Sequence, residues 1–98
     1  MNRADAIRRL QDAAADIRAR GATSLYLFGS TARDEARAES DLDLFVDYDH
    51  SRRFSVVDLV RIKNLLEDRL GIAVDVTTRD SLHPALRRDI ENAALRVF

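Results

Sequence analysis

Three aspartates and one glycine–serine pair have the residue types that phosphate and metal chemistry needs. Asp41 and Asp43 lie one residue apart in an alternating segment, and a strand places such side chains on one face, with Cα atoms about 6.6 Å apart. Carboxylates at this spacing suit Mg²⁺, which proteins hold with a few carboxylates together with phosphate oxygens. Asp75 lies on the polar side of a later alternating segment and is the candidate third carboxylate. We therefore expect an acidic metal site if the two segments are neighbours in one sheet.

A tight turn at Gly29 and Ser30 precedes the paired acids by ten residues. It joins a short apolar run to a segment of good helix formers. Glycine lets the backbone approach a phosphate group without a Cβ, and free N–H groups at a helix start donate to it, as the Ser30 hydroxyl would. The turn and the acids together predict a site for a nucleoside triphosphate.

Two stretches of the chain resemble the signature of the polymerase β-type nucleotidyltransferase superfamily. They are Leu27-Phe28-Gly29-Ser30-Thr31-Ala32-Arg33 and Ser40-Asp41-Leu42-Asp43-Leu44. More narrowly, the chain is similar to the minimal nucleotidyltransferases, which act as antitoxins beside HEPN-domain toxins in prokaryotes. The chain length, the leading helix, Asp75 and the Leu82-His83-Pro84 stretch before a final helix all fall where that family has them. Asp34 stands where the family most often has glycine.

This resemblance implies a Mg²⁺-dependent enzyme that transfers AMP from ATP to a hydroxyl group, with pyrophosphate as the leaving group. In the antitoxin branch the acceptor is a tyrosine of the paired HEPN ribonuclease, which is thereby silenced. By the same resemblance Asp41 and Asp43 would bind the metal ions, and Asp75 would bind the catalytic metal and help to activate the acceptor. Gly29 and Ser30 would hold the β and γ phosphates.

Two alternatives stay open from the sequence. In the first, the chain is a catalytically weak or inactive binding module that neutralises its partner by contact. In the second, it modifies a small molecule or an RNA end with the help of a separate chain. A protein acceptor is favoured because about 98 residues are largely consumed by one nucleotide-binding core, so a partner protein or a second copy of the chain would have to supply the acceptor's platform. The resemblance implies that this partner is a HEPN-domain protein.

The elements that position these residues follow from hydrophobic periodicity and from capping residues. We expect helices over residues 2–20, 31–37 and 56–70 and from Pro84 onward, and strands over residues 24–28, 41–47, 72–77 and 95–98. Ser30 and Ser55 are the expected helix caps. The core stripe of the long second helix is expected to contain Val56, Leu59, Ile62, Leu66 and Leu70. The sum is an α/β (α+β) domain, a small mixed sheet packed with helices, as in a minimal polymerase β-like nucleotidyltransferase fold.

Length and composition limit the function classes. A chain of 98 residues holds one core, so we expect a single domain over residues 1–98. A net charge of −1 argues against direct nucleic-acid binding, and the sequence has no apolar stretch that predicts a membrane span or a signal peptide. The absence of cysteine fits a cytoplasmic protein. The oligomeric state is left open.

Several polar residues have more ordinary interpretations. Asp47 and Asp49 are expected to solvate the end of a strand, and the two histidines lack the further ligands of a transition-metal site. His83 is expected at a helix start. The arginines at positions 33 and 37 are within reach of a triphosphate, but a short exposed helix usually leaves arginines solvated.

Overall fold

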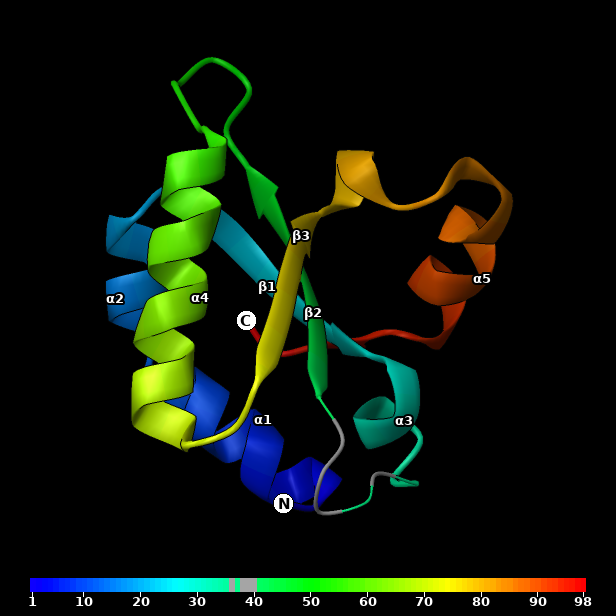
Figure 1. Cartoon of the computed structure of the whole chain (residues 1–98). Helices are drawn as coiled ribbons and strands as arrows, with labels where there is room; N and C mark the ends of the chain where they lie inside the picture. The colour runs from blue at the N-terminus through cyan, green and yellow to red at the C-terminus, as the bar shows by residue number, and fades with distance from the viewer. Residues whose placement is uncertain (36, 38–40) are drawn as a thin grey trace.

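The computed structural model describes residues 1–35, 37 and 41–98, and Figure 1 shows their arrangement. The helices are α1 (Arg3–Asp12), α2 (Ala14–Ala19), α3 (Gly29–Ala32), α4 (Val56–Leu70) and α5 (Pro84–Ala93), with one 3-10 turn, η1 (Arg79–Ser81). The strands are β1 (Ala22–Phe28), β2 (Leu42–Tyr48), β3 (Val74–Thr78) and β4 (Leu95–Arg96). No helix in the described part of the chain is both long and apolar enough to cross a bilayer.

The four strands form one mixed sheet in the order β3-β2-β1-β4. Strand β1 pairs with β2 and with β4 in antiparallel fashion, whereas β2 and β3 run parallel. The parallel pair is possible because α4 connects the two strands, as a crossover helix does. The expectation of a small mixed sheet packed with helices is confirmed.

One face of the sheet packs against α1, α2 and α4, and the apolar core lies between them (Figure 1). The strands alternate, so that Leu25 and Leu27 of β1 and Leu42 and Leu44 of β2 point into this core and are at most 1% exposed. The long helix α4 contributes the buried side chains of Ile62, Leu66 and Leu70. The alternation places Asp43, which lies between Leu42 and Leu44, on the opposite face.

The opposite face carries an aromatic and ionic cluster around Arg79. Its guanidinium donates to both carboxylate oxygens of Asp47 (2.8 and 3.0 Å) and to Glu91 of α5 (2.6 Å). It also lies 4.8 Å from the ring centre of Tyr26 and 5.0 Å from that of Phe45, and these two rings stack on each other. The expectation that Asp47 merely solvates the end of a strand is wrong, because both of its carboxylate oxygens accept from Arg79.

We expect Arg79→Met to lower the free energy of unfolding by about 2 kcal/mol, because it removes a bidentate ion pair and leaves the part-buried Asp47 carboxylate without its partner. Arg87→Met is the matched control. Arg87 also donates to Glu91 (3.2 Å), but it is more exposed, so its loss should cost less than about 0.5 kcal/mol. Urea unfolding of both variants measures the difference, and equal losses would contradict the assigned role of Arg79.

Two expected helices differ in the structure. The helix expected over residues 2–20 is divided at Ala13, whose N–H donates to the carbonyl of Leu10 in a tight turn. The helix expected over residues 31–37 begins earlier and spans Gly29–Ala32, with Phe28 at the N-cap position, so the Ser30 cap is wrong. Part of the expected range, residue 36, lies outside the described residues. The expected caps Ser55 and His83 are confirmed, and Asp58 accepts from the Ser55 N–H at 2.8 Å.

Asp34 explains why α3 is short. Its φ of 58° is left-handed, its N–H donates to the carbonyl of Thr31, and the N–H of Glu35 donates to that of Ser30 (2.8 Å). These two bonds form a Schellman motif, in which the left-handed position favours glycine. The Asp34 carboxylate accepts from the N–H of Arg3 (3.1 Å), and it thereby ties the start of α1 to this turn.

We expect Asp34→Gly to leave the free energy of unfolding within about 0.5 kcal/mol of the wild type, because relief of the left-handed backbone offsets the lost bond to Arg3. Asp34→Val loses the bond and places a β-branched residue at a positive φ, which should cost about 1–2 kcal/mol. Chemical denaturation of both variants tests this, and a more stable valine variant would refute it.

Candidate active site

Asp43 and Asp75 lie directly opposite each other on neighbouring parallel strands. Their flanking residues Leu42 and Val74 are buried in the core, so both carboxylates belong to the face away from it. Asp41 immediately precedes β2 and is exposed. The expected neighbourhood of β2 and β3 is thus observed, and it brings the three predicted acids to one end of the sheet.

The three acids interact electrostatically. Partial burial, followed by the negative charges of Asp75 and Asp41, raises the pKa of the Asp43 carboxyl, while the positive charge of Arg33 opposes this shift. Like charges that share a site disfavour each other's ionised form. Asp43 is therefore the centre of an acidic cluster that would gain stability from a cation.

Gly29 lies against the carboxylate of Asp43. Strand β1 ends at Phe28, which pairs with Asp43, and the chain turns at Gly29 with a φ of 76°. A Cβ built at this position would lie 2.4 Å from Oδ2 of Asp43, closer than any real contact. The glycine is required both for the left-handed backbone and for the close approach. Ser30 is the next residue, half-buried in the first turn of α3, and within the described residues that helix has no side-chain cap.

The carboxylate oxygens of the three aspartates suit a hard divalent cation, because negatively charged oxygen atoms are the ligands that Mg²⁺ prefers. The mutual repulsion seen at Asp43 is the charge that such an ion would neutralise. Over residues 1–35, 37 and 41–98, however, no group of three acidic or imidazole side chains is close enough to hold a metal ion. The cluster has suitable donors that do not converge on one point.

Comparison with known proteins connects this arrangement to a family. The nucleotidyltransferase domain family matches residues 7–97. The chain belongs to this family. A Methanocaldococcus jannaschii protein provisionally named a protein adenylyltransferase is 43% identical over 78 residues, which cover 80% of this chain and 82% of the relative. The protein adenylyltransferase MntA of Thermococcus cleftensis is 30% identical over 70 residues, which cover 71% of this chain and 69% of MntA.

Solved structures agree with the fold of this nucleotidyltransferase. A structure provisionally described as a minimal nucleotidyltransferase has a TM-score of 0.79 and 36% identity, and covers 97% of this chain and 95% of its own. A crystal structure of a toxin–antitoxin with AMP-PNP shares the fold with a TM-score of 0.73 at 18% identity, and covers 90% and 72% of the two chains. The resemblance to the minimal nucleotidyltransferases is confirmed.

Arg33 is closer to the candidate site of the nucleotidyltransferase than the sequence suggested. It is exposed and pairs with Glu35 (3.0 Å), but its charge reaches Asp43 and acts on the pKa of that carboxyl. The sequence predicted that Arg33 is solvated. The one feature of the sequence that indicates a role for Arg33 in the site is its position in the short segment after Gly29 and Ser30.

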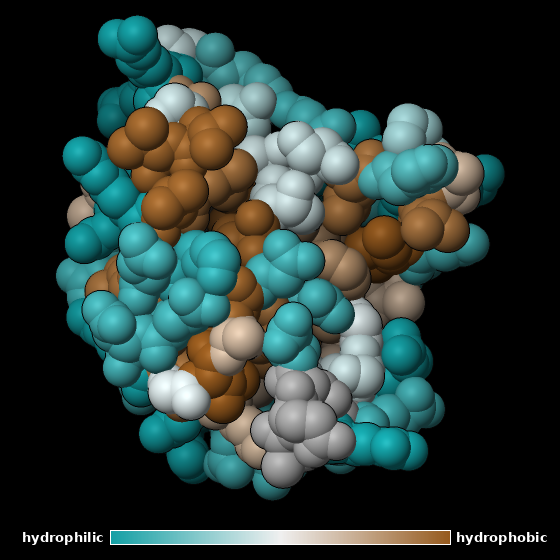
Figure 2. All heavy atoms as spheres, in the orientation of Figure 1, coloured by the Kyte–Doolittle hydropathy of each residue, from teal (hydrophilic) through white to brown (hydrophobic). Residues whose placement is uncertain are grey.

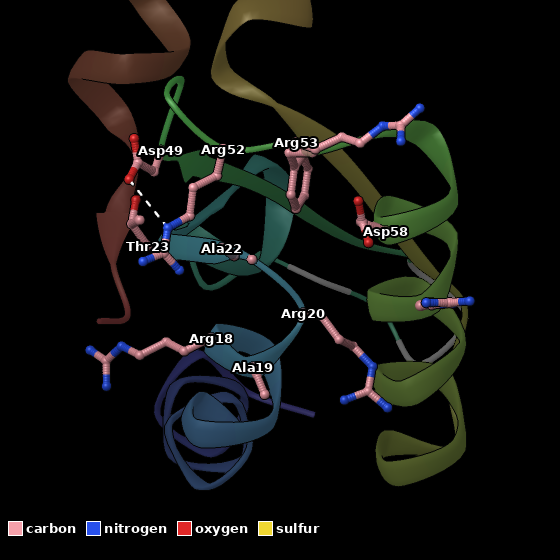
Figure 3. Close-up of a pocket in the computed structure, with 12 residues that line it drawn as sticks. Arg18, Ala19, Arg20, Ala22, Thr23, Asp49, Arg52, Arg53 and Asp58 are labelled. Atoms are coloured by element: carbon pink, nitrogen blue, oxygen red, sulfur yellow. Dashed lines mark ion pairs between the residues drawn. The ribbon is translucent and has the colours of Figure 1, made fainter.

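A separate cleft of about 700 Å³ lies at the other end of the sheet, around the start of β1 and the loop after β2 (Figure 3). Five arginines line it: Arg18, Arg20, Arg52, Arg53 and Arg61. Its two acids are engaged locally, since Asp49 accepts from Ser51 and pairs with Arg52, and Asp58 caps α4. None of the predicted site residues lines this cleft.

Proposed function

We propose that this nucleotidyltransferase transfers AMP from ATP to a hydroxyl group of a partner protein. The observation that carries the proposal is the acidic cluster of Asp41, Asp43 and Asp75, with Gly29 against its centre, in a chain of this family. The names of the relatives from Methanocaldococcus jannaschii and Thermococcus cleftensis support a protein as the acceptor. We take residues 1–98 as one nucleotidyltransferase domain that acts in the cytoplasm.

In this proposal Asp41, Asp43 and Asp75 would hold Mg²⁺ between them. When bound, the ion would supply positive charge that offsets the negative charge of the triphosphate. The acceptor hydroxyl oxygen forms a bond to the α phosphorus, and the bond from that phosphorus to the bridging oxygen breaks, so that pyrophosphate leaves. The exposed Asp75 carboxylate takes the proton of the acceptor hydroxyl, which gives it a role beyond holding the metal.

The turn after β1 would bind the other end of the triphosphate. Gly29 packs directly against the Asp43 carboxylate, where a Cβ has no room, so a triphosphate bound by this turn would lie next to the acidic cluster. The Ser30 hydroxyl would donate to the β or γ phosphate. Arg33, whose charge already reaches the cluster, is placed to neutralise part of the triphosphate.

The partner we propose is a HEPN-domain toxin, modified on a tyrosine, with this chain as its antitoxin. Asp41 and Asp75 are exposed, so an acceptor side chain that another molecule presents can approach them. The toxin–antitoxin structure with AMP-PNP, which shares this fold, is consistent with an ATP-using antitoxin.

The test uses purified protein with Mg²⁺ in a lysate of its host, with ATP labelled at the α phosphate in one tube and at the γ phosphate in another. We expect a labelled protein band only in the α tube, and no band with the variant Asp41→Ala, Asp43→Ala. Label from the γ tube alone would indicate phosphoryl transfer and would refute nucleotidyl transfer. Circular dichroism of the variant controls for folding.

A contact-only antitoxin is the second candidate, because the sequence leaves open that the chain neutralises its partner by contact. In that case the variant Asp41→Ala, Asp43→Ala still protects cells from the partner toxin. Loss of protection together with loss of label supports the enzyme.

A further inference from the structure

Three valines are exposed in the first two turns of α4. Val56, Val57 and Val60 are 73%, 57% and 47% exposed, and Figure 2 shows hydrophobic side chains gathered over this end of the helix. The expectation that Val56 belongs to the core stripe is wrong, because the stripe begins further along the helix. Residues three and four apart share one side of a helix, so the valines form one continuous apolar patch.

This patch is separate from the core face of α4. Ile62, Leu66 and Leu70 fill the core, and the helix stays well anchored without the valines. The capping box between Ser55 and Asp58 accounts for the start of the helix. Nothing in the local fold therefore requires valine at these positions, where exposed side chains of the helix are usually polar.

Two arginines flank the patch. Arg53 precedes it by three residues and Arg61 follows Val60, and both are exposed. Within the part of the chain that the structure describes, neither guanidinium has a hydrogen bond or an ion pair. Both arginines also line the arginine-lined cleft next to the start of α4 (Figure 3). Asp58, the nearest acid in the sequence, accepts from the N–H of Ser55 and keeps its negative charge, so the two arginines outnumber the acids at the rim by one positive charge.

We propose that this valine–arginine face, made of Arg53, Val56, Val57, Val60 and Arg61, binds an amphipathic helix of the partner protein whose apolar side chains are flanked by aspartate or glutamate. Apolar side chains at the centre with arginines at the rim are typical of protein interfaces. RNA phosphates would pair with the arginines but would leave the valines in water. A second copy of this chain would bring like-charged rims together.

The face lies away from the acidic cluster. Asp43 is at the start of β2, whereas α4 begins after the loop that follows the end of β2. A partner bound here would leave Asp41 and Asp75 accessible, so docking and modification use different surfaces. The inference rests on the proposed function in one respect, which is that the protein bound at this face is also the acceptor of AMP.

The test adds a synthetic helical peptide to the isotope-labelled full chain and monitors the amide signals by NMR. The peptide has about 18 residues, with leucines on one side of the helix and glutamates beside them. We expect shifts at residues 53–61. A peptide with lysine in place of each glutamate should bind at least about tenfold more weakly. Equal binding of the two peptides, no binding, or shifts elsewhere would overturn the proposal.

Variants of the chain sharpen the test. Arg53→Glu with Arg61→Glu should reverse the preference between the two peptides, while the matched control Arg9→Glu, on α1, should leave it unchanged. Shifts at the valines that depend only on protein concentration would indicate a second copy instead. Competition of a single-stranded RNA oligomer for residues 53–61 would also contradict a protein ligand. The catalytic proposal is read separately from AMP labelling, so either can fail alone.

Discussion

Replacing Asp43 by asparagine is expected to abolish nucleotidyl transfer and, at the same time, to make the ligand-free protein more stable. The activity should fall at least about 100-fold, because the central carboxylate of the cluster is lost. Burial and the charges of Asp75 and Asp41 raise the pKa of Asp43 in the folded protein above its ordinary value of 3.8. The ionised carboxylate therefore destabilises the fold at neutral pH, and asparagine removes that charge.

The sign of the pH dependence follows from the same shift. The folded state binds the Asp43 proton more tightly than the unfolded chain, so this destabilisation is absent below the ordinary pKa of 3.8 and complete above the raised pKa. At pH 7 the asparagine variant should melt about 2 to 4 °C higher, as is common when an active-site charge is removed from a domain of this size.

Thermal melts with and without Mg²⁺ and a non-hydrolysable ATP analogue measure both effects. The ligands should stabilise the wild type and leave the variant nearly unchanged. Asp68→Asn, the same substitution at an exposed site on α4, is the control and should alter neither property by much. A less stable but active Asp43→Asn variant would contradict the account of the cluster.

Gly29→Ala should damage the site and the fold together. The new Cβ would lie 2.4 Å from Oδ2 of Asp43, so the carboxylate must move, and alanine at a φ of 76° is strained. The backbone strain costs about 1–2 kcal/mol, which corresponds to a melting temperature roughly 4 to 16 °C lower. Transfer should fall at least about 100-fold, because both the proposed metal ligand Asp43 and the proposed phosphate-binding turn are displaced.

Gly71→Ala separates the two causes. Gly71 ends α4 with a similar φ of 70°, but a Cβ there meets nothing within 4 Å. This variant should lose a similar free energy of unfolding and keep its transfer rate. If the Gly29→Ala variant retained its transfer activity at a temperature where it is folded, the close approach of Gly29 to Asp43 would not contribute to catalysis.

Much of the fold could be predicted from the sequence, because local patterns are strong at the relevant positions. The alternation around Leu42 and Leu44 predicts β2, and Gly71 predicts the end of α4. That Asp75 belongs beside Asp43 could be stated only conditionally, since single-sequence patterns do not determine the order of strands in a sheet. The parallel pairing of β2 and β3 supplies that condition.

The remaining differences come from long-range contacts. The break at Ala13 had no local signal, because alanine is a good helix former. Asp47 and Arg79 are 32 residues apart, and their bidentate pair depends on how η1 lies over the sheet. Val56 has the right spacing for the core stripe, but the helix points it away from the sheet. The Schellman motif at Asp34 shows the opposite case, in which a departure from the family's usual glycine has a local explanation.

The most direct measurement of the central proposal is the intact mass of the partner that carries the α-phosphate label, purified after co-expression with this chain. We predict a mass increase by whole AMP units, on a tyrosine identified by peptide fragmentation, and no increase with the variant Asp41→Ala, Asp43→Ala. An unmodified partner, an added phosphate in place of AMP, or the same modification with the double variant would contradict the proposal.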